Sequence, residues 1–506
     1  MGIKTHRKDL KFTPDASRVV TRFFNNGDIR TKQLILKILE FSEDKVAEEL
    51  QNTLHEFKGR HRNLKKIFKR HCSNYKDLIN QIAIDYEQLT ENQKMLIGAY
   101  STLEYSIESA ALFNPSMIED LDQSFLKKGE KRVIISFRAT GEGHLSSIVF
   151  RKGILDQKNN LHISKVRNHI DLPEVGNKMS YNKERFVEKM QEINIPQNYI
   201  SEIMDPLPDH FEYYALKEAV KKLLDGNNLE SAKKLALHEM TWLVDSYYDL
   251  KFNELSDITE RVIFPNSPAE SRGIEDARFV RFTDDEGSDT IYATYTAYNG
   301  HTIIPKLLST SNFIDFRIMP LHGNAAQNKN FALFPRKIKG KYAMLARIDG
   351  YNNYVVFSDR ITLWNDPIKI QEPKFAWDLT QIGNCGSPIY TDEGWLILTH
   401  GVGPMRRYCI GASLLDLEDP TRVIGRLKEP LISPSKEERE GYVPNVVYSC
   451  GGIIHNEDLI IPYAVSDYSS SYATVNLKSL MDKLKTSLDN DAETQDHSSK
   501  ANRANK

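Results

Sequence analysis

The stretch KYAMLARIDG, residues 341–350, is a short apolar segment that ends in charged and turn-forming residues. Four other stretches share this outline: RVIISFRATG (132–141), TIYATYTAYNG (290–300), GWLILTHGVG (394–403) and DLIIPYAVSD (458–467). Aligning them places Arg138, Thr296, Arg347, His400 and Ala464 at one equivalent position, with spacings of 51, 53 and 64 residues from Thr296 onward. Periods near fifty residues with several strands each are typical of propeller blades. The sequence therefore predicts a mainly β fold, a five-bladed β-propeller.

Helical periodicity occupies two other parts of the chain, from about residue 28 to 110 and from about 182 to 252. The second block accounts for the long gap between the first two repeats. We therefore expect an N-terminal α-helical region and an α-helical insertion between the first two blades. The predicted boundaries are 1–100 for the helical region, 101–165 for the first blade, 166–255 for the insertion, 256–485 for the remaining blades and 486–506 for a disordered tail.

Composition narrows the class of protein. The 506 residues carry 67 basic and 69 acidic side chains, a balance that gives no reason to expect nucleic acid or an anionic membrane as a partner. The start, MGIKTHRKDLKF, lacks the apolar core of a secretory signal, and the four cysteines have no paired spacing. These features predict a cytoplasmic protein with reduced thiols and without a zinc site.

The equivalent positions of the repeats carry a chemical prediction. Corresponding positions on inner propeller strands converge on the central channel, so Arg138, Arg347 and His400 are expected to face one another. Cations gathered in a partly desolvated cleft repel each other unless an anion is bound between them. The alternative is that each of them pairs with a carboxylate nearby.

The motif RGIEDARFV, residues 272–280, places two carboxylates at the start of an apolar alternating segment. Strand alternation predicts that Asp276 and Arg278 share one face while Glu275 and Phe279 point the other way. Arg278 is then able to orient Asp276 or to bind hydroxyl groups of a ligand. A structural Asp–Arg pair at the end of a strand is the alternative.

Several motifs, in order, resemble glycoside hydrolase family 130, the inverting β-mannoside phosphorylases and related β-mannosidases, which are five-bladed propellers. They are FNPSM (113–117), GIEDAR (273–278), NKNFALFPRKIKGKYAMLAR (328–347), GWLILTHGVG (394–403), YCIGASLLDLEDPTRVIGRLKEPLISP (408–434), GYVPNVVY (441–448) and PYAVSD (462–467). The resemblance covers about residues 100–165 and 256–480. Position 277 is Ala where the family usually has Pro.

The resemblance implies a role for each matching residue. Asp276 corresponds to the catalytic acid, which in the family is thought to act through the 3-hydroxyl of the mannosyl unit. The phosphate-binding positions correspond to Lys329, Arg347 and His400. Asn114 and Asp467 match positions that contact the mannosyl unit, and Arg138 matches a basic residue near the same subsite. Asn114 also suits a turn before Pro115, and Asp467 suits a turn cap.

The function that follows is inverting phosphorolysis of a β-mannoside (a manno-oligosaccharide) to α-mannose 1-phosphate and a shortened acceptor. Inorganic phosphate is the co-substrate, and no metal or organic cofactor is expected. A phosphorylase holds an anionic nucleophile with cations, whereas an inverting hydrolase needs a second carboxylate to activate water. The alternatives are a β-mannosidase, a transferase using a sugar phosphate donor, and a non-catalytic carbohydrate-binding propeller. The helical regions are expected to mediate homo-oligomerisation or to wall off one side of the cleft.

Overall fold

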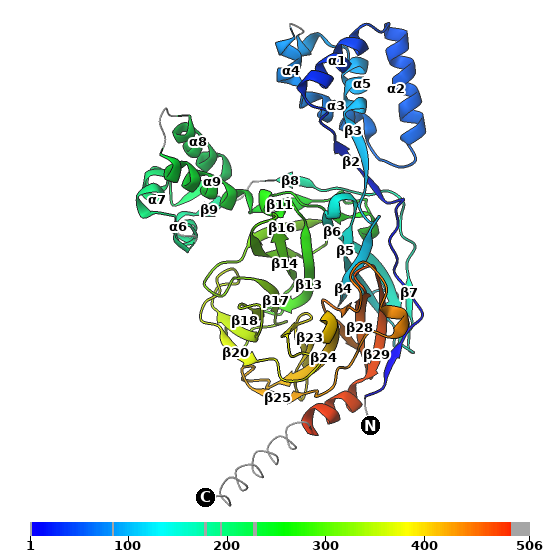
Figure 1. The fold of residues 1–506 in the computed structure, drawn as a ribbon, viewed down its shortest axis with the longest axis vertical. Helices are drawn as coiled ribbons and strands as arrows, with labels where there is room; N and C mark the ends of the chain where they lie inside the picture. The colour runs from blue at the N-terminus through cyan, green and yellow to red at the C-terminus, as the bar shows by residue number, and fades with distance from the viewer. Residues whose placement is uncertain (1–2, 83–84, 177–179, 193–194, 226–229, 487–506) are drawn as a thin grey trace, which may run out of the picture.

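The computed structural model describes residues 3–82, 85–176, 180–192, 195–225 and 230–486 (Figure 1). The predicted disordered tail, 486–506, lies outside these residues except for its first position. The described part of the chain is mainly β with two groups of helices, and none of its helices is long and apolar enough to cross a membrane.

Five antiparallel sheets of four or more strands are formed by the described residues. The β4–β7 sheet also contains β12, and the β13–β16 sheet also contains β8 and β11. The β17–β20, β21–β25 and β26–β29 sheets follow, with β1 at the edge of the last. The strands of the first two sheets are β4 (Ala111–Glu119), β5 (Lys131–Thr140), β6 (Ser146–Leu155), β7 (Leu161–Ile163), β12 (Val262–Ile263), β8 (Glu174–Gly176), β11 (Tyr248–Lys251), β13 (Ile274–Thr283), β14 (Asp289–Tyr298), β15 (Ile303–Thr310) and β16 (Asp315–Pro320).

The other three sheets complete the arrangement around a common centre in Figure 1. Their strands are β17 (Lys329–Leu333), β18 (Tyr342–Arg347), β19 (Asn353–Ser358), β20 (Ile368–Gln371), β21 (Gln381–Asn384), β22 (Ile389–Thr391), β23 (Gly394–Gly403), β24 (Arg407–Leu415), β25 (Val423–Arg426), β26 (Val447–Tyr448), β27 (Ile453–His455), β28 (Asp458–Val465), β29 (Ser469–Asn476) and β1 (Thr5–Arg7).

Apolar clusters join each sheet to the next. One cluster contains Phe150 of β6 and Phe279 of β13, and another contains Phe282 of β13 and Met344 of β18. The remaining three link β17–β20 to β21–β25, β21–β25 to β26–β29, and β26–β29 back to β4–β7. The last sheet therefore packs against the first, and burial of apolar surface at all five junctions stabilises the arrangement.

The register predicted from the repeats is confirmed. The five equivalent residues lie on β5, β14, β18, β23 and β28. Each is opposite a residue of the neighbouring strand, which is β4, β13, β17, β21 or β26. The pairs are Phe113↔Arg138, Glu275↔Thr296, Lys329↔Arg347, Gly383↔His400 and Tyr448↔Ala464. Because the pairing is the same in every sheet, the repeat in the sequence is a repeat in space.

Nine of the helices within the described residues form two lobes outside the sheets, and a further helix, 477–486, follows β29 and packs against the last two sheets (Figure 1). Each lobe has its own apolar cluster. The first lobe contains α1 (Asp28–Leu39), α2 (Glu43–Phe57), α3 (Leu64–Ser73), α4 (Lys76–Gln81) and α5 (Glu91–Tyr100), and the second contains α6 (Lys183–Glu192), α7 (Gln197–Met204), α8 (Tyr213–Leu224) and α9 (Ser231–Asp245). A two-stranded ribbon of β2 (Val19–Phe23) and β3 (Thr102–Ser106) connects the first lobe to the sheets, and β9 (Ser180–Asn182) pairs with β10 (His210–Glu212) in the second.

Strands also occur inside the two ranges predicted to be helical. β1 pairs with β29, so the beginning and the end of the described chain share one sheet. β8 and β11, at the two ends of the insertion, extend the β13–β16 sheet. The second helical lobe is therefore connected at both ends to that sheet, through β8 and β11.

A buried ion pair holds the segment that leads into β13. Glu270 and Lys306 lie 2.8 Å apart, and both side chains are fully buried. Glu270 also accepts hydrogen bonds from the hydroxyls of Tyr248 and Tyr295 and from the backbone N–H of Asn266. A buried carboxylate with this many donors is satisfied, and it fixes the chain six residues before Asp276.

Removing one partner of this pair is predicted to destabilise the fold. Lys306→Met leaves the Glu270 carboxylate buried without its cation, which we expect to lower the free energy of unfolding by about 3 to 5 kcal/mol. Urea unfolding monitored by circular dichroism measures it. The control is Lys341→Met, because Lys341 is half-exposed and 3.7 Å from Asp359, and its loss should be less than about 1 kcal/mol. Equal effects of the two substitutions would contradict the prediction.

Candidate active site

A pocket of about 220 Å³ lies where strands β4, β13, β17, β21 and β26 of the five sheets come together. Seven of the eight predicted site residues line it, and Arg278 lies behind Asp276, donating to its backbone oxygen at 2.9 Å. The residues that line the pocket are Asn114, Arg138, Glu275, Asp276, Lys329, Asn330, Arg347, Gln381, His400, Arg406, Tyr408, Val443, Val446, Tyr448 and Asp467. The structure thus brings together residues that are up to 353 positions apart.

A larger cavity, of about 1090 Å³, lies between α3 and the sheets. Two of its charged side chains, those of Arg62 and Lys66, are ion-paired with Glu260 and Glu174. The smaller pocket contains more of the predicted catalytic and binding side chains than the larger cavity does. Cavity volume alone therefore does not identify the active site.

Backbone bulges turn side chains into the pocket at matching places in three sheets. Asn114, Asp276 and Asn330 have positive φ angles of 49°, 53° and 68°, and the strand register shifts at each of them. Asn and Asp tolerate this left-handed conformation better than most residues do. The bulge breaks the alternation of side chains along the strand.

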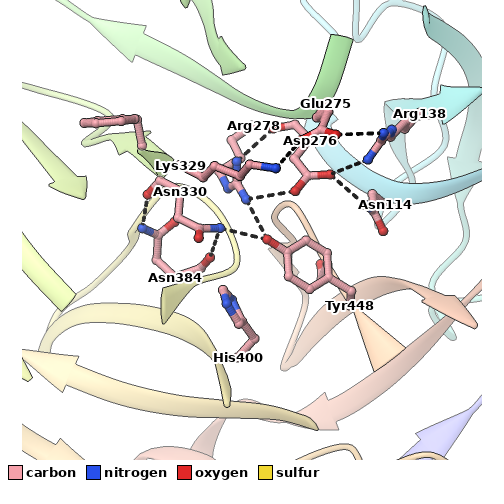
Figure 2. A network of polar contacts seen from close by, with 12 residues as sticks. Asn114, Arg138, Glu275, Asp276, Arg278, Lys329, Asn330, Asn384, His400 and Tyr448 are labelled. Carbon is pink, nitrogen blue, oxygen red and sulfur yellow. Dashed lines mark hydrogen bonds and ion pairs between the residues drawn. The ribbon is translucent and has the colours of Figure 1, made fainter. Parts of the chain in front are cut away.

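This bulge corrects the prediction for Glu275. Strand alternation placed Glu275 on the face opposite Asp276, but both side chains enter the pocket (Figure 2). The prediction was wrong because alternation holds only while φ and ψ stay in the β region.

Asp276 is surrounded by cations. Its carboxylate accepts a hydrogen bond from Asn114 Nδ2 at 2.6 Å, and it lies 3.6 Å from Arg278 Nη2 and 3.9 Å from Arg138 Nη1 (Figure 2). Burial acts to raise the pKa of Asp276. The charges of Arg278, Arg138 and Lys329 outweigh that effect, and the net pKa is lowered. Asp276 is therefore ionised in the unliganded protein.

Glu275 holds two of the predicted site cations. Its carboxylate lies 3.0 Å from Arg138 Nη2 and 2.5 Å from Lys329 Nζ. The alternative of a local carboxylate partner therefore applies to Arg138, and Lys329 is paired with the same carboxylate. Glu275 stands beside Asp276 on the same strand, and its two ion pairs link β13 to β5 and β17.

Arg347 and His400 form the opposite part of the pocket. Arg347 Nη1 lies 3.4 Å from His400 Nε2, and among the described residues no carboxylate is within ion-pair distance of Arg347. Burial, together with the charges of Arg347 and Arg278, lowers the pKa of His400 well below its usual value. His400 is thus neutral at physiological pH. Arg347 Nε and His400 Nδ1 have no hydrogen-bond partner within the described part of the chain.

The sequence predictions missed a buried polar network in the wall of this pocket. Tyr448 Oη accepts hydrogen bonds from Arg278 Nη2 at 2.7 Å and from Asn330 Nδ2 at 2.8 Å, and Asn384 donates to the backbone oxygen of Asn330 (Figure 2). A signal was present, because Asn114, Asp276, Asn330 and Asn384 each follow the paired residue in their strand. Tyr448 is itself the paired residue in its strand, opposite Ala464.

Asp467 completes the pocket from the turn between β28 and β29. Ser466 and Asp467 have φ angles of 48° and 50°, which turn this segment toward the pocket. Burial, followed by repulsion from Asp276, raises the pKa of Asp467 to about 6. The pocket therefore contains one carboxyl group that titrates near neutral pH.

Comparisons with known proteins identify the family. A model described as beta-1,4-mannooligosaccharide phosphorylase matches residues 243–486. The 1,2-beta-oligomannan phosphorylase of Thermoanaerobacter sp. (strain X514) is 35% identical over 219 residues, which are 42% of this chain and 71% of that protein. The beta-1,2-mannobiose phosphorylase of Listeria innocua is 32% identical over 231 residues, 44% of this chain and 63% of that protein.

Among solved structures, the beta-1,2-mannobiose phosphorylase of Listeria innocua in complex with beta-1,2-mannobiose gives a TM-score of 0.44 at 22% identity, covering 74% of this chain and 92% of that one. The sequence relationships place the chain in its family. It belongs to glycoside hydrolase family 130.

The raised pKa of Asp467 predicts a stabilising substitution. The folded state holds the Asp467 proton up to about pH 6, whereas the unfolded chain releases it near pH 3.8. Ionising Asp467 above pH 6 therefore costs the folded state about 2 to 3 kcal/mol, a cost that is absent below pH 3.8. We expect Asp467→Asn to be more stable than the wild type at pH 8, with a gain that shrinks as the pH falls.

Urea unfolding of both proteins at pH 8, 6 and 4 measures this gain. The control is Asp359→Asn, because the side chain of Asp359 is 78% exposed and should show no such gain. A gain that stayed constant across this pH range would contradict the assignment.

Proposed function

We propose that the protein catalyses inverting phosphorolysis of a β-mannoside. A phosphate oxygen forms a bond to the anomeric carbon as the glycosidic C–O bond breaks, giving α-mannose 1-phosphate and a shortened acceptor. The observation that carries the proposal is the arrangement of the pocket, with Asp276 on one side and the Arg347–His400 pair on the other. The names of the family model and of the relatives support the same reaction.

The charge balance of the pocket suits an anionic nucleophile. Four cationic side chains line it, those of Arg138, Lys329, Arg347 and Arg406, against the carboxylates of Glu275, Asp276 and Asp467. Arg278 adds a buried cation behind Asp276. A phosphate dianion therefore enters a site with surplus positive charge, where a planar guanidinium such as that of Arg347 can bind two of its oxygens.

Phosphate binding also prepares Asp276 to act as the acid. In the unliganded pocket the surrounding cations keep this carboxyl ionised. A bound dianion offsets those cations and raises the pKa of Asp276 toward the range in which it can hold and donate a proton. The proton then moves to the leaving glycosidic oxygen, in the family through the 3-hydroxyl of the mannosyl unit, and Asp276 returns to its ionised form.

The remaining predicted residues are assigned to the sugar. Asn114, Arg138 and Asp467 lie on the β4–β7 and β26–β29 side of the pocket, where they hold the mannosyl unit. Arg278 lies behind Asp276 on β13, where it orients the acid or holds the sugar. We also assign the five sheets as the blades of a five-bladed β-propeller. The five apolar junctions, including the one between the last and first sheets, support this assignment.

The second candidate is hydrolysis of the same bond, and Asp467 is the observation that favours it. An inverting hydrolase needs a carboxylate to deprotonate water, and Asp467 has a pKa of about 6. Glu275 is less suited to that role, because it is ion-paired with two cations and is adjacent to Asp276. Phosphorolysis remains the primary proposal because Arg347 lacks a carboxylate partner among the described residues.

Phosphorolysis requires phosphate as its only co-reactant, and we propose no organic cofactor or metal. Among the described residues, no group of three or more His, Cys, Asp or Glu side chains is arranged to hold a metal ion. Cytoplasmic location and homo-oligomerisation through the helical lobes remain proposals.

An activity assay tests the reaction. The wild type, incubated with β-1,2- and β-1,4-linked manno-oligosaccharides, is expected to release α-mannose 1-phosphate only when phosphate is present. Asp276→Asn keeps the shape of the side chain but has no proton to donate, so turnover should fall by at least about 1000-fold. Release of free mannose at the same rate without phosphate would instead establish hydrolysis.

Substituting Gly383 tests the phosphate pocket by itself. A Cβ at this position would lie 2.5 Å from His400 Cε1 and 3.3 Å from Arg347 Cδ, so Gly383→Ala must displace the pair. We expect the KM for phosphate to rise about tenfold or more, and the KM for the oligosaccharide to change less than about twofold. Gly59→Ala is the control, because no atom lies within 4 Å of its added Cβ. An unchanged KM for phosphate would contradict the assignment of Arg347 and His400.

A further inference from the structure

An aromatic pair lies at the rim of the pocket. Tyr442 is 60% exposed, and it immediately precedes Val443, which lines the pocket. Its hydroxyl lies 3.1 Å from His144 Nδ1, and the two rings are 5.3 Å apart with an interplanar angle of 36°. The two residues are 298 positions apart, so this contact joins two different sheets.

The pair is held in place on both sides. His144 belongs to the turn η2 (Glu142–His144) between β5 and β6, and Tyr105 Oη donates to the backbone oxygen of Glu142 at 2.9 Å. On the other side, Val443 N–H donates to the backbone oxygen of Ser466 at 3.0 Å. Because both supporting segments are fixed, the Tyr442 ring presents an open apolar surface in a defined position.

The location of the pair decides what it can bind. Its supports belong to the β4–β7 and β26–β29 sheets, which also supply Asn114, Arg138 and Asp467. The proposed phosphate residues come instead from the β17–β20 and β21–β25 sheets, through Lys329, Arg347 and His400. Tyr442 therefore lies on the side of the pocket assigned to sugar, where it is exposed next to Val443 of the pocket lining.

We propose that Tyr442, positioned by His144, forms a binding platform for a sugar unit beyond the disaccharide that spans the cleaved bond. The substrate class is then a β-linked mannosyl chain of three or more units. The C–H faces of sugar rings pack on aromatic rings, and the hydrogen bond between the tyrosine hydroxyl and His144 fixes the orientation of this ring. This inference rests on the proposed function for the identity of the sugar, but the platform can be tested by binding alone.

The kinetic test compares chain lengths. In the wild type, kcat/KM for phosphorolysis should be about tenfold higher for the trisaccharide than for the disaccharide. Tyr442→Ala should remove this preference by lowering the trisaccharide value, while the disaccharide value stays within about twofold. Tyr442→Phe keeps the ring and should retain most of the preference, and His144→Ala should lose part of it.

The matched control is Tyr214→Ala. Tyr214 is 69% exposed, but it lies on α8 in the second helical lobe. Both rates should be unchanged in this variant. The platform is overturned if the wild type shows no preference for the longer chain, or if Tyr442→Ala lowers both values equally.

A binding measurement separates the platform from the reaction. Isothermal titration of the Asp276→Asn protein with the di- and trisaccharide reports the contribution of the third unit without turnover, and Tyr442→Ala in that background should abolish it. If the wild type released no α-mannose 1-phosphate but this difference in binding persisted, the proposed function would fail and the platform would stand. Equal affinities for the two sugars, with or without Tyr442, would reject the platform.

Discussion

The left-handed backbone at Asp276 is the constraint on which the pocket depends. It places two consecutive carboxylates in one small space, where their mutual repulsion must be offset by cations. Those cations come from different sheets, Arg138 from β5 and Lys329 from β17, with Arg278 on the same strand as the carboxylates. The ion pairs that offset the repulsion between Glu275 and Asp276 therefore also connect three sheets near the pocket.

In the proposed reaction, this arrangement would tie phosphate binding to proton donation. Lys329 is bound to Glu275 in the unliganded pocket, yet it also contributes to the lowered pKa of Asp276. An anion bound to Lys329 and Arg347 offsets their positive charge. The electrostatic lowering of the Asp276 pKa then becomes smaller. The acid is therefore expected to gain its proton only when the nucleophile is present, which protects the sugar from attack by water before phosphate arrives.

The sequence predicts the repeated features well and the non-repeated contacts poorly. Arg138, Arg347 and His400 fall at equivalent positions because the period of the strands carries the register. The error at Glu275 came from applying alternation through a bulge, although the Asn or Asp at 114, 276 and 330 marked its place. Tyr448 was missed although the repeat places it opposite Ala464, because its hydrogen bond to Arg278 joins two different sheets and no local pattern encodes that contact.

The helical lobes are separate from the chemistry of the pocket. Every residue that lines the pocket lies in or between strands from β4 onward, and none lies in α1 to α9. The lobes have their own apolar cores and meet the sheets through contacts such as Arg62–Glu260 and the Tyr247–His322 hydrogen bond. The active pocket is thus specified by the five sheets, while the lobes add surface at their edge. Each lobe buries its own apolar core, but Leu36 on α1, Tyr214 on α8 and Leu235 on α9 stay exposed, so the surface that the lobes add includes apolar side chains away from the pocket.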